Sequence, residues 1–147
     1  MQAVIIGILS SLCISDAFAA SATANIAVSY AVPRVCSFSN LPATINLNAQ
    51  GGQAFTYSTS FNITCNTNSN INLSLASQNK TGTQMRLRSN TGNKFILYSA
   101  AVNGTNYPSN TAQSITPNAT SYLLYLSFAA PDYANTFRDT LTFTLTY

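Results

Sequence analysis

The chain has 147 residues and a formal net charge of +3; 46% of its residues are hydrophobic, only 6% are charged, and histidine and tryptophan are absent. This length predicts a single domain. Disordered chains are poor in aromatic and β-branched residues, and this chain is rich in both, so we expect it to fold. A cytosolic protein normally has many more charged residues, so the low charge favours an extracellular structural or adhesive protein. The lack of histidine excludes a serine or cysteine nucleophile activated by its usual base.

The N-terminal residues have the pattern of an export signal. Val4 to Ile14 is an apolar run too short to span a bilayer, and Ala17-Phe18-Ala19 has the small residues of a signal-peptidase site. We therefore expect residues 1–19 to be a cleaved signal peptide, whose loss also removes Cys13. Because no Lys or Arg precedes the apolar run, a signal anchor and a different start codon remain as alternatives.

The mature chain begins with an alternating segment that places Ile26, Val28, Tyr30 and Val32 on one face. Pro33 ends it, because proline cannot donate to a strand ladder. Similar short segments follow at residues 61–65, 71–75, 85–88 and 94–98, with a loop ending at Gly51-Gly52 and a long polar connection from Gly104 through Pro117. Residues 122–128 are more continuously apolar, which predicts a strand covered on both faces.

The last residues, Asp139 to Tyr147, alternate most strictly of all. Leu141, Phe143, Leu145 and Tyr147 fall on one face and threonines on the other, which is the strongest strand signal in the chain. About seven short strands separated by turn residues predict an all-β antiparallel sandwich. No turn and no further strand follow in the sequence, so the apolar strands at both ends present edges that must be covered.

Removal of the signal leaves two cysteines, Cys36 and Cys65. An even pair in an exported chain predicts one disulfide, closing a loop of about thirty residues. A metal site is the alternative, but two cysteines without histidine cannot complete a tetrahedral shell. We expect no metal and no cofactor.

Charged residues give little sign of a catalytic or nucleic-acid site. The basic residues are scattered, and the one close pair, Arg86 and Arg88, is typical of a solvated strand face, so we expect no nucleic-acid partner. Asp132 and Asp139 are the acids of the mature chain. They could pair as glycosidase carboxylates, but Asp132 follows a proline in a turn and Asp139 opens the last strand, so we expect no enzyme.

Taken together, these motifs resemble the spore-coat-protein-U-like pilin domain of archaic chaperone–usher pili. The resemblance rests on a cysteine soon after the first alternating strand, a second cysteine closing a later strand, and a terminal aromatic-x-Asp-Thr segment: VPRVCSF, FNITC and FRDTLTFTLTY. A fourth segment, MRLRSNTGNKFILYSA, matches the family's arginine followed by a leucine-tyrosine strand. The resemblance covers essentially all of Ala22 to Tyr147.

The resemblance implies an immunoglobulin-like sandwich without its last strand, exported through the periplasm to a cell-surface pilus. A periplasmic chaperone first fills the groove, and the N-terminal strand of another pilin subunit replaces it at an outer-membrane usher, by strand addition. Ile26, Val28, Tyr30 and Val32 would be the donor residues, and Leu141, Phe143, Leu145 and Tyr147 would line part of the acceptor groove.

The expected organisation is therefore a signal peptide (1–19), a donor extension (20–33) and one pilin domain (34–147). Two alternatives remain. The segment from Ile26 to Val32 could fold back as the first strand of its own domain. The protein could also be a secreted β-sandwich that acts as a monomer, either a coat protein or a carbohydrate binder that uses exposed tyrosines.

Overall fold

The structure is a computed structural model that describes residues 22–48, 52–118, 121–132 and 134–147. The expected signal peptide, residues 1–19, lies outside the described residues. The chain divides into an N-terminal unit, described over residues 22–31, and a second unit, Val32–Tyr147.

The second unit consists of short β-strands, and the described residues contain no helix, so none of them forms a helix able to span a membrane. The strands are β1 (Cys36–Ser39), β2 (Phe55–Cys65), β3 (Ile71–Ser77), β4 (Met85–Ser89), β5 (Phe95–Val102), β6 (Thr105–Asn106), β7 (Ala112–Ile115), β8 (Tyr122–Phe128), β9 (Phe137–Arg138) and β10 (Leu141–Thr146).

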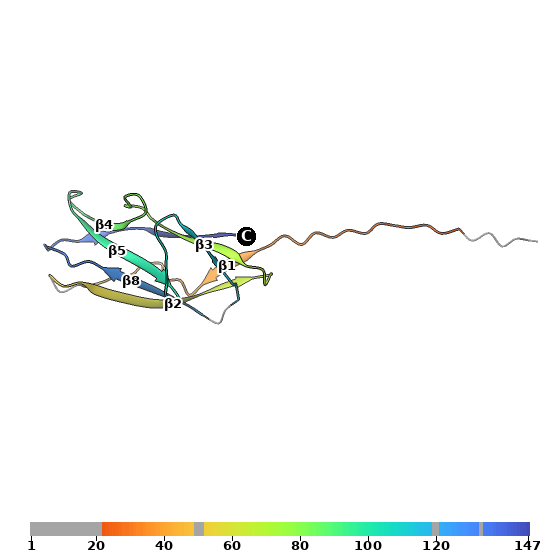
Figure 1. The fold of residues 1–147 in the computed structure, drawn as a ribbon, viewed down its shortest axis with the longest axis horizontal. Coiled ribbons are helices and arrows are strands. Elements are labelled where there is room, and N and C mark those ends of the chain that lie inside the picture. The colour runs from red at the N-terminus through yellow and green to blue at the C-terminus, as the bar shows by residue number, and fades with distance from the viewer. Residues whose placement is uncertain (1–21, 49–51, 119–120, 133) are drawn as a thin grey trace, which may run out of the picture. The chain divides into compact units, whose positions relative to one another are not determined.

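These strands form two antiparallel sheets. The larger has the order β1-β2-β8-β5-β4-β9, with β6 added to β5, and the smaller has the order β10-β3-β7. Figure 1 shows β2, β8, β5 and β4 side by side in the larger sheet. The expected all-β, immunoglobulin-like antiparallel sandwich is confirmed.

The core lies between the two sheets and follows the alternation of their strands. In β3, Ile71, Leu73 and Leu75 are buried while the intervening side chains are more exposed, because successive side chains of a strand point to opposite faces. Phe61 packs against Phe143 with ring centroids 5.7 Å apart, and so connects β2 of the large sheet with β10 of the small one. Such aromatic pairs stabilise by about 0.5–1.5 kcal/mol beyond the area that they bury.

The expectation for residues 122–128 was wrong. In β8, Tyr122 and Leu124 point into the core, but Leu123 and Tyr125 are 50% and 42% exposed, so one face of this strand is open in the described structure. The apolar pattern did not predict which face of this strand is buried, because apolar residues occupy both faces. Hydrophobicity then does not tell which face is covered.

The long connection from Gly104 through Pro117 is also more ordered than its polar composition indicated. Asn103 and Gly104 have φ values of 49° and 81°, and Val102 pairs with Thr105 across them. Positive φ at both central residues is the geometry of a type I′ hairpin turn, for which Asn-Gly is the preferred sequence. This turn joins β5 to β6, and β7 follows before the connection ends.

Candidate functional site

The second unit has a groove of about 1170 Å³ between residues 41–48 and the chain from Ala134 to Phe143. Its floor comes from the large sheet. The large apolar side chains that line it include Leu41, Ile45, Leu47, Phe55, Leu87, Ile96, Leu124, Leu126, Phe128, Phe137, Leu141 and Phe143. Such a volume lies above the usual range for a small-molecule pocket, and its lining suits an extended apolar segment.

One wall of the groove is an extended stretch without a strand partner. Ile45 and Leu47 are half-buried against the core, and Asn46 and Asn48 between and beside them are exposed. Within the described part of the chain, no backbone–backbone hydrogen bond involves residues 43–48. The sequence analysis treated this stretch as loop. The short alternation of Ile45 and Leu47 was the signal that could have identified a groove wall.

The opposite wall is β10, whose outer edge is unpaired. β10 is the first strand of the small sheet and pairs with β3 alone among the described strands. The N–H of Gln78 donates to the carbonyl of Thr140 (3.0 Å), so Thr140 and Gln78 are a hydrogen-bonded pair. Hydrogen-bonded and non-hydrogen-bonded pairs then alternate along the rest of β10. The backbone groups of Thr142 and Thr144 therefore point toward β3, and those of Leu141, Phe143 and Leu145 point to the outer edge.

The structure brings only part of the expected acceptor set to the groove. Leu141 and Phe143 line it, Leu145 is half-buried against the core, and Tyr147 is 49% exposed. The sequence analysis did not identify the floor, which Leu124, Leu126 and Phe128 of β8 supply. Their period was visible in the sequence, but only the packing of the two sheets brings them to the same groove as Leu141 and Phe143.

The end of the groove where β10 begins is polar. The Tyr98 hydroxyl donates to Asp139 Oδ2 (2.6 Å), and the backbone N–H and side-chain Nδ2 of Asn79 donate to Oδ1 (3.1 and 3.0 Å). Burial, followed by the hydrogen bond to Asp139, raises the pKa of Tyr98 far above its ordinary value. Tyr98 therefore remains a neutral hydrogen-bond donor to the carboxylate over the whole physiological range.

The expected donor residues lie in an extended segment without secondary structure. Ile26, Val28 and Tyr30 are 87%, 89% and 88% exposed, and Val32 is also exposed. The expected strand over Ile26 to Val32 is therefore not formed in the single chain. The physical reason is that a strand is stabilised by hydrogen bonds and side-chain contacts with a neighbouring strand. The segment combines large exposed apolar side chains with strict alternation.

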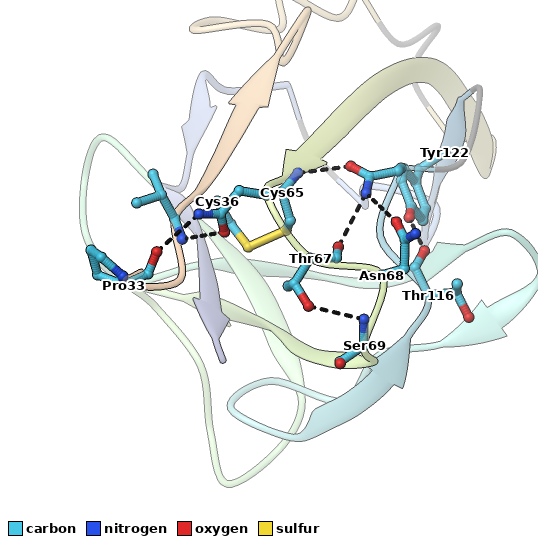
Figure 2. The surroundings of a disulfide bond; sticks show 11 residues. Pro33, Cys36, Cys65, Thr67, Asn68, Ser69, Thr116 and Tyr122 are labelled. Carbon is cyan, nitrogen blue, oxygen red and sulfur yellow. Dashed lines mark hydrogen bonds between the residues drawn. A yellow bond between two sulfur atoms is a disulfide. The ribbon is translucent and has the colours of Figure 1, made fainter. Parts of the chain in front are cut away.

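A disulfide joins Cys36 of β1 to Cys65 of β2, the pair that the sequence analysis expected. The two residues lie directly opposite each other in the ladder, with Cα atoms 4.2 Å apart. Figure 2 shows this disulfide and the nearby hydrogen bond from the Tyr122 hydroxyl to the Thr116 carbonyl. The Cys65 N–H donates to the Asn118 side chain (2.8 Å), so the end of β2 is held by covalent and hydrogen bonds.

The two acidic side chains of the described residues have different surroundings. Asp132 is exposed in a turn, whereas the Asp139 carboxylate is held by Tyr98 and Asn79. The described residues contain no group of three or more His, Cys, Asp or Glu side chains that could hold a metal ion. The basic residues are less scattered than the sequence indicated, because the pairing of β4 with β9 sets Arg88 directly opposite Arg138.

No protein-family model matches the chain, and no curated protein matches it either. Solved structures do. One is described as a chaperone–tip adhesin complex vital for synergistic activation of CFA/I fimbriae biogenesis; it is 20% identical with a TM-score of 0.53, and the match covers 76% of this chain and 42% of that one.

Another is the CsuC–CsuE chaperone–tip adhesion subunit pre-assembly complex from the archaic chaperone–usher Csu pili of Acinetobacter baumannii. It is 22% identical with a TM-score of 0.51, and the match covers 79% of this chain and 40% of that one. This chain thus spans about two fifths of the length of each. At these identities the likeness establishes a fold shared with chains of the two complexes.

Proposed function

We propose that this protein is a structural subunit of an extracellular pilus, polymerised by donation of the N-terminal strand of one copy to the groove of the next. The observation that carries the proposal is the coexistence, in one chain, of an apolar groove beside an unpaired strand edge and an exposed alternating apolar segment. Main-chain hydrogen bonds to β10 would supply affinity, and side chains entering the groove would supply specificity.

The two features are complementary in their chemistry. Ile26, Val28, Tyr30 and Val32 occupy one face of the donor segment (residues 22–32), and the groove is lined mainly by aliphatic and aromatic side chains. Burial of a Val, Ile or Tyr-sized apolar side chain contributes about 1.5–3 kcal/mol. Four such side chains, added to a ladder of backbone hydrogen bonds, would offset the entropy cost of ordering the segment at a junction between subunits.

The partners that follow from this proposal are other pilin subunits, a periplasmic chaperone and an outer-membrane usher. An open groove with an unpaired strand edge is an aggregation site, so the subunit needs a temporary cover after export. The structural neighbours come from chaperone complexes of fimbriae and pili, which supports this route. The disulfide, the signal-like N-terminus and a role outside the cytoplasm fit the same pathway.

The test is assembly of a chain that lacks the donor segment. Deletion of residues 22–32 should leave a subunit that is recovered with the chaperone but does not enter fibres. A substitution pair sharpens the test: Val28→Asp buries an unpaired charge in the groove, whereas Ser29→Asp places the same charge on the outward face. We expect loss of fibres on the cell surface for the first and retention for the second. Normal fibres from the deletion would refute the mechanism.

The carbohydrate-binding alternative gains little from the structure. Tyr98, Tyr107 and Tyr122 are buried and therefore unavailable for stacking on a sugar. Tyr57 is half-buried, and the exposed tyrosines, Tyr30, Tyr125 and Tyr147, lie in three different segments. A sugar site normally combines an exposed aromatic platform with convergent polar groups. No observation favours that function over strand donation.

A further inference from the structure

The polar end of the groove contains a carboxylate that accepts hydrogen bonds from neutral donors among the described residues. Asp139 is half-buried and accepts three hydrogen bonds, one from the Tyr98 phenol and two from Asn79. A carboxylate offers about four acceptor sites, so one on Oδ2 remains for another donor. A partly desolvated anion beside an apolar cavity is stabilised most by a cation.

The alternation of β10 continues back to this carboxylate. Asp139, Leu141, Phe143, Leu145 and Tyr147 share one side of the terminal segment, and all of them are odd-numbered. The half-buried members, Asp139 through Leu145, show that this side faces inward. An added strand on the outer edge would place its own inward residues directly opposite these.

The donor segment offers a matching series that ends in a cation. Continuing the period beyond Val32 reaches Arg34, so the inward-facing series is Ile26, Val28, Tyr30, Val32 and Arg34. Antiparallel pairing is the mode of every described strand pair in this fold. It sets the two series opposite each other with Tyr30 facing Phe143 and Arg34 facing Asp139.

From this match we infer that Arg34 of the incoming copy pairs with Asp139 of the receiving copy and fixes the register of the donated strand. The inference rests on the proposed function. A slip of two residues one way would place Val32 beside the carboxylate, and a slip the other way would bring Arg34 against Leu141 in the apolar groove. Either slip leaves a charge without its partner in a poorly hydrated site, which disfavours it.

The surroundings of Arg34 agree with this role. The Val35 N–H donates to Asn66 Oδ1 (2.9 Å), and Asn66 Nδ2 donates to the Pro33 carbonyl (2.9 Å), so the backbone on both sides of Arg34 is held by its own domain. The Arg34 side chain is exposed. Arg34 therefore lies at the junction of the donor segment and its own domain. On donation, this junction would meet the polar end of the groove in the next copy.

Proline in this segment is compatible with the same register. Pro33 falls on the outward-facing series, opposite Thr140, where the backbone N of the added strand points away from β10. Its missing N–H therefore costs no hydrogen bond to the receiving strand. A register of opposite parity would direct Pro33 at β10 and turn every apolar donor side chain outward.

Disulfide trapping in surface fibres of the full chain tests the register directly. In the inferred register Ser29 lies opposite Thr144 at a non-hydrogen-bonded pair, where Cα atoms are about 4.5 Å apart and a disulfide can form. Ser29→Cys is combined in turn with Thr142→Cys, Thr144→Cys or Thr146→Cys, three exposed positions of one strand. We expect covalent multimers with Thr144→Cys to exceed the other two by about tenfold, a preference of about 1.4 kcal/mol.

The role of the charge pair is tested in the same backgrounds. Arg34→Gln should spread the cross-links over all three threonine positions, Arg34→Lys should largely restore the Thr144→Cys product, and Arg88→Gln, a cation elsewhere on the surface, should change nothing. Asp139→Asn in the receiving copy should reproduce the Arg34→Gln pattern. Because Arg34 is exposed, its variants keep the domain intact even where Asp139→Asn does not.

The outcomes separate this inference from the proposed function. Absence of fibres from the unmodified chain would refute strand donation itself. Fibres whose main cross-link is at Thr142→Cys or Thr146→Cys would keep strand donation and overturn the register. Fibres cross-linked at Thr144→Cys, with a distribution that Arg34→Gln leaves unchanged, would overturn the pairing of Arg34 with Asp139.

Discussion

Asp139 has a structural role in its own domain whether or not a neighbour contributes a cation. It lies just before β10, and it connects Asn79, which follows β3, with Tyr98 in β5 of the other sheet. Hydrogen bonds to a charged group contribute about 1.5–3 kcal/mol each when buried. These hydrogen bonds therefore connect the two sheets at the N-terminal end of β10.

The raised pKa of Tyr98 predicts a pH dependence of stability. The unfolded chain releases this phenolic proton near pH 10, whereas the folded chain retains it, so the unfolded state binds fewer protons above about pH 10. The contribution of Tyr98 to the free energy of unfolding should therefore be complete below about pH 10. It should decrease as the pH rises above that value. Urea unfolding between about pH 8 and 11 should show a shallower decline for Tyr98→Phe.

The same Tyr98→Phe variant should lower the free energy of unfolding at neutral pH by about 1.5–3 kcal/mol, because it removes a hydrogen bond to a carboxylate. Tyr125→Phe on the exposed face is the matched control and should have little effect at either pH. Equal changes in the two variants would show that the Asp139 contact is not the cause.

The disulfide acts at the same scale, by restricting the unfolded chain. It joins residues 29 apart in sequence, for which the chain-entropy model gives about 3–4 kcal/mol. Cys36→Ala combined with Cys65→Ala should lower the free energy of unfolding by that amount in urea titrations. Chemical reduction of the unmodified protein should have a similar effect. A loss below about 1 kcal/mol would mean that the reduced chain retains compact structure.

At the scale of elements, β10 is the strand on which the proposed function depends. It is strongly patterned, half-buried on one face, and paired on one side only. Exposed strand edges are normally protected by charges, prolines or bulges, and the unpaired edge of β10 carries threonines between apolar residues instead. An edge left in this state is suited to accept a strand.

Hydrogen exchange should distinguish the two edges of β10 residue by residue. The amides of Thr142 and Thr144 donate toward β3 and should exchange slowly, while those of Phe143 and Leu145 face the unpaired edge and should exchange faster in the isolated subunit. In fibres, the amides of Phe143 and Leu145 should become as slow as their neighbours. Unchanged exchange at these two positions on assembly would contradict pairing along this edge.

At the scale of the whole molecule, the proposed function makes the sandwich the acceptor of a segment from another copy. Its apolar floor and wall are built from both sheets, so any segment that fills the groove adds contacts to each sheet at once. A ligand that binds only the folded state raises the free energy of unfolding by mass action. Donor binding and domain stability are therefore coupled.

A synthetic peptide of residues 22–34 should stabilise the full chain measurably. At a concentration of about 100 times its Kd, the peptide should add about 2.7 kcal/mol and raise Tm by roughly 10 °C. The same peptide with Val28→Asp should leave Tm unchanged, because it would bury an unpaired charge. Equal stabilisation by both peptides would show that binding does not use the groove.

Part of this architecture followed from the sequence, and part did not. The alternation of Ile71 to Leu75 and of Leu141 to Tyr147 indicated strands and their inward faces, because the period of two is a local property of the backbone. The same rule failed for Leu123 and Tyr125, where apolar residues lie on an open face. It also missed Ile45 and Leu47, whose alternation was too short to stand out.

By itself, the sequence determined the all-β class, the cysteine pair, the apolar alternation of Ile26 to Val32 and the inward face of the last strand. Each of these follows from residue type and local spacing. Only the tertiary structure decided three features: β10 keeps an unpaired edge among the described strands, residues of β8 line the same groove as Leu141 and Phe143, and Asp139 accepts hydrogen bonds from Tyr98 and Asn79 at the polar end of that groove. The two side-chain contacts of Asp139 join residues 41 and 60 positions apart, and local periodicity does not encode contacts at such separations.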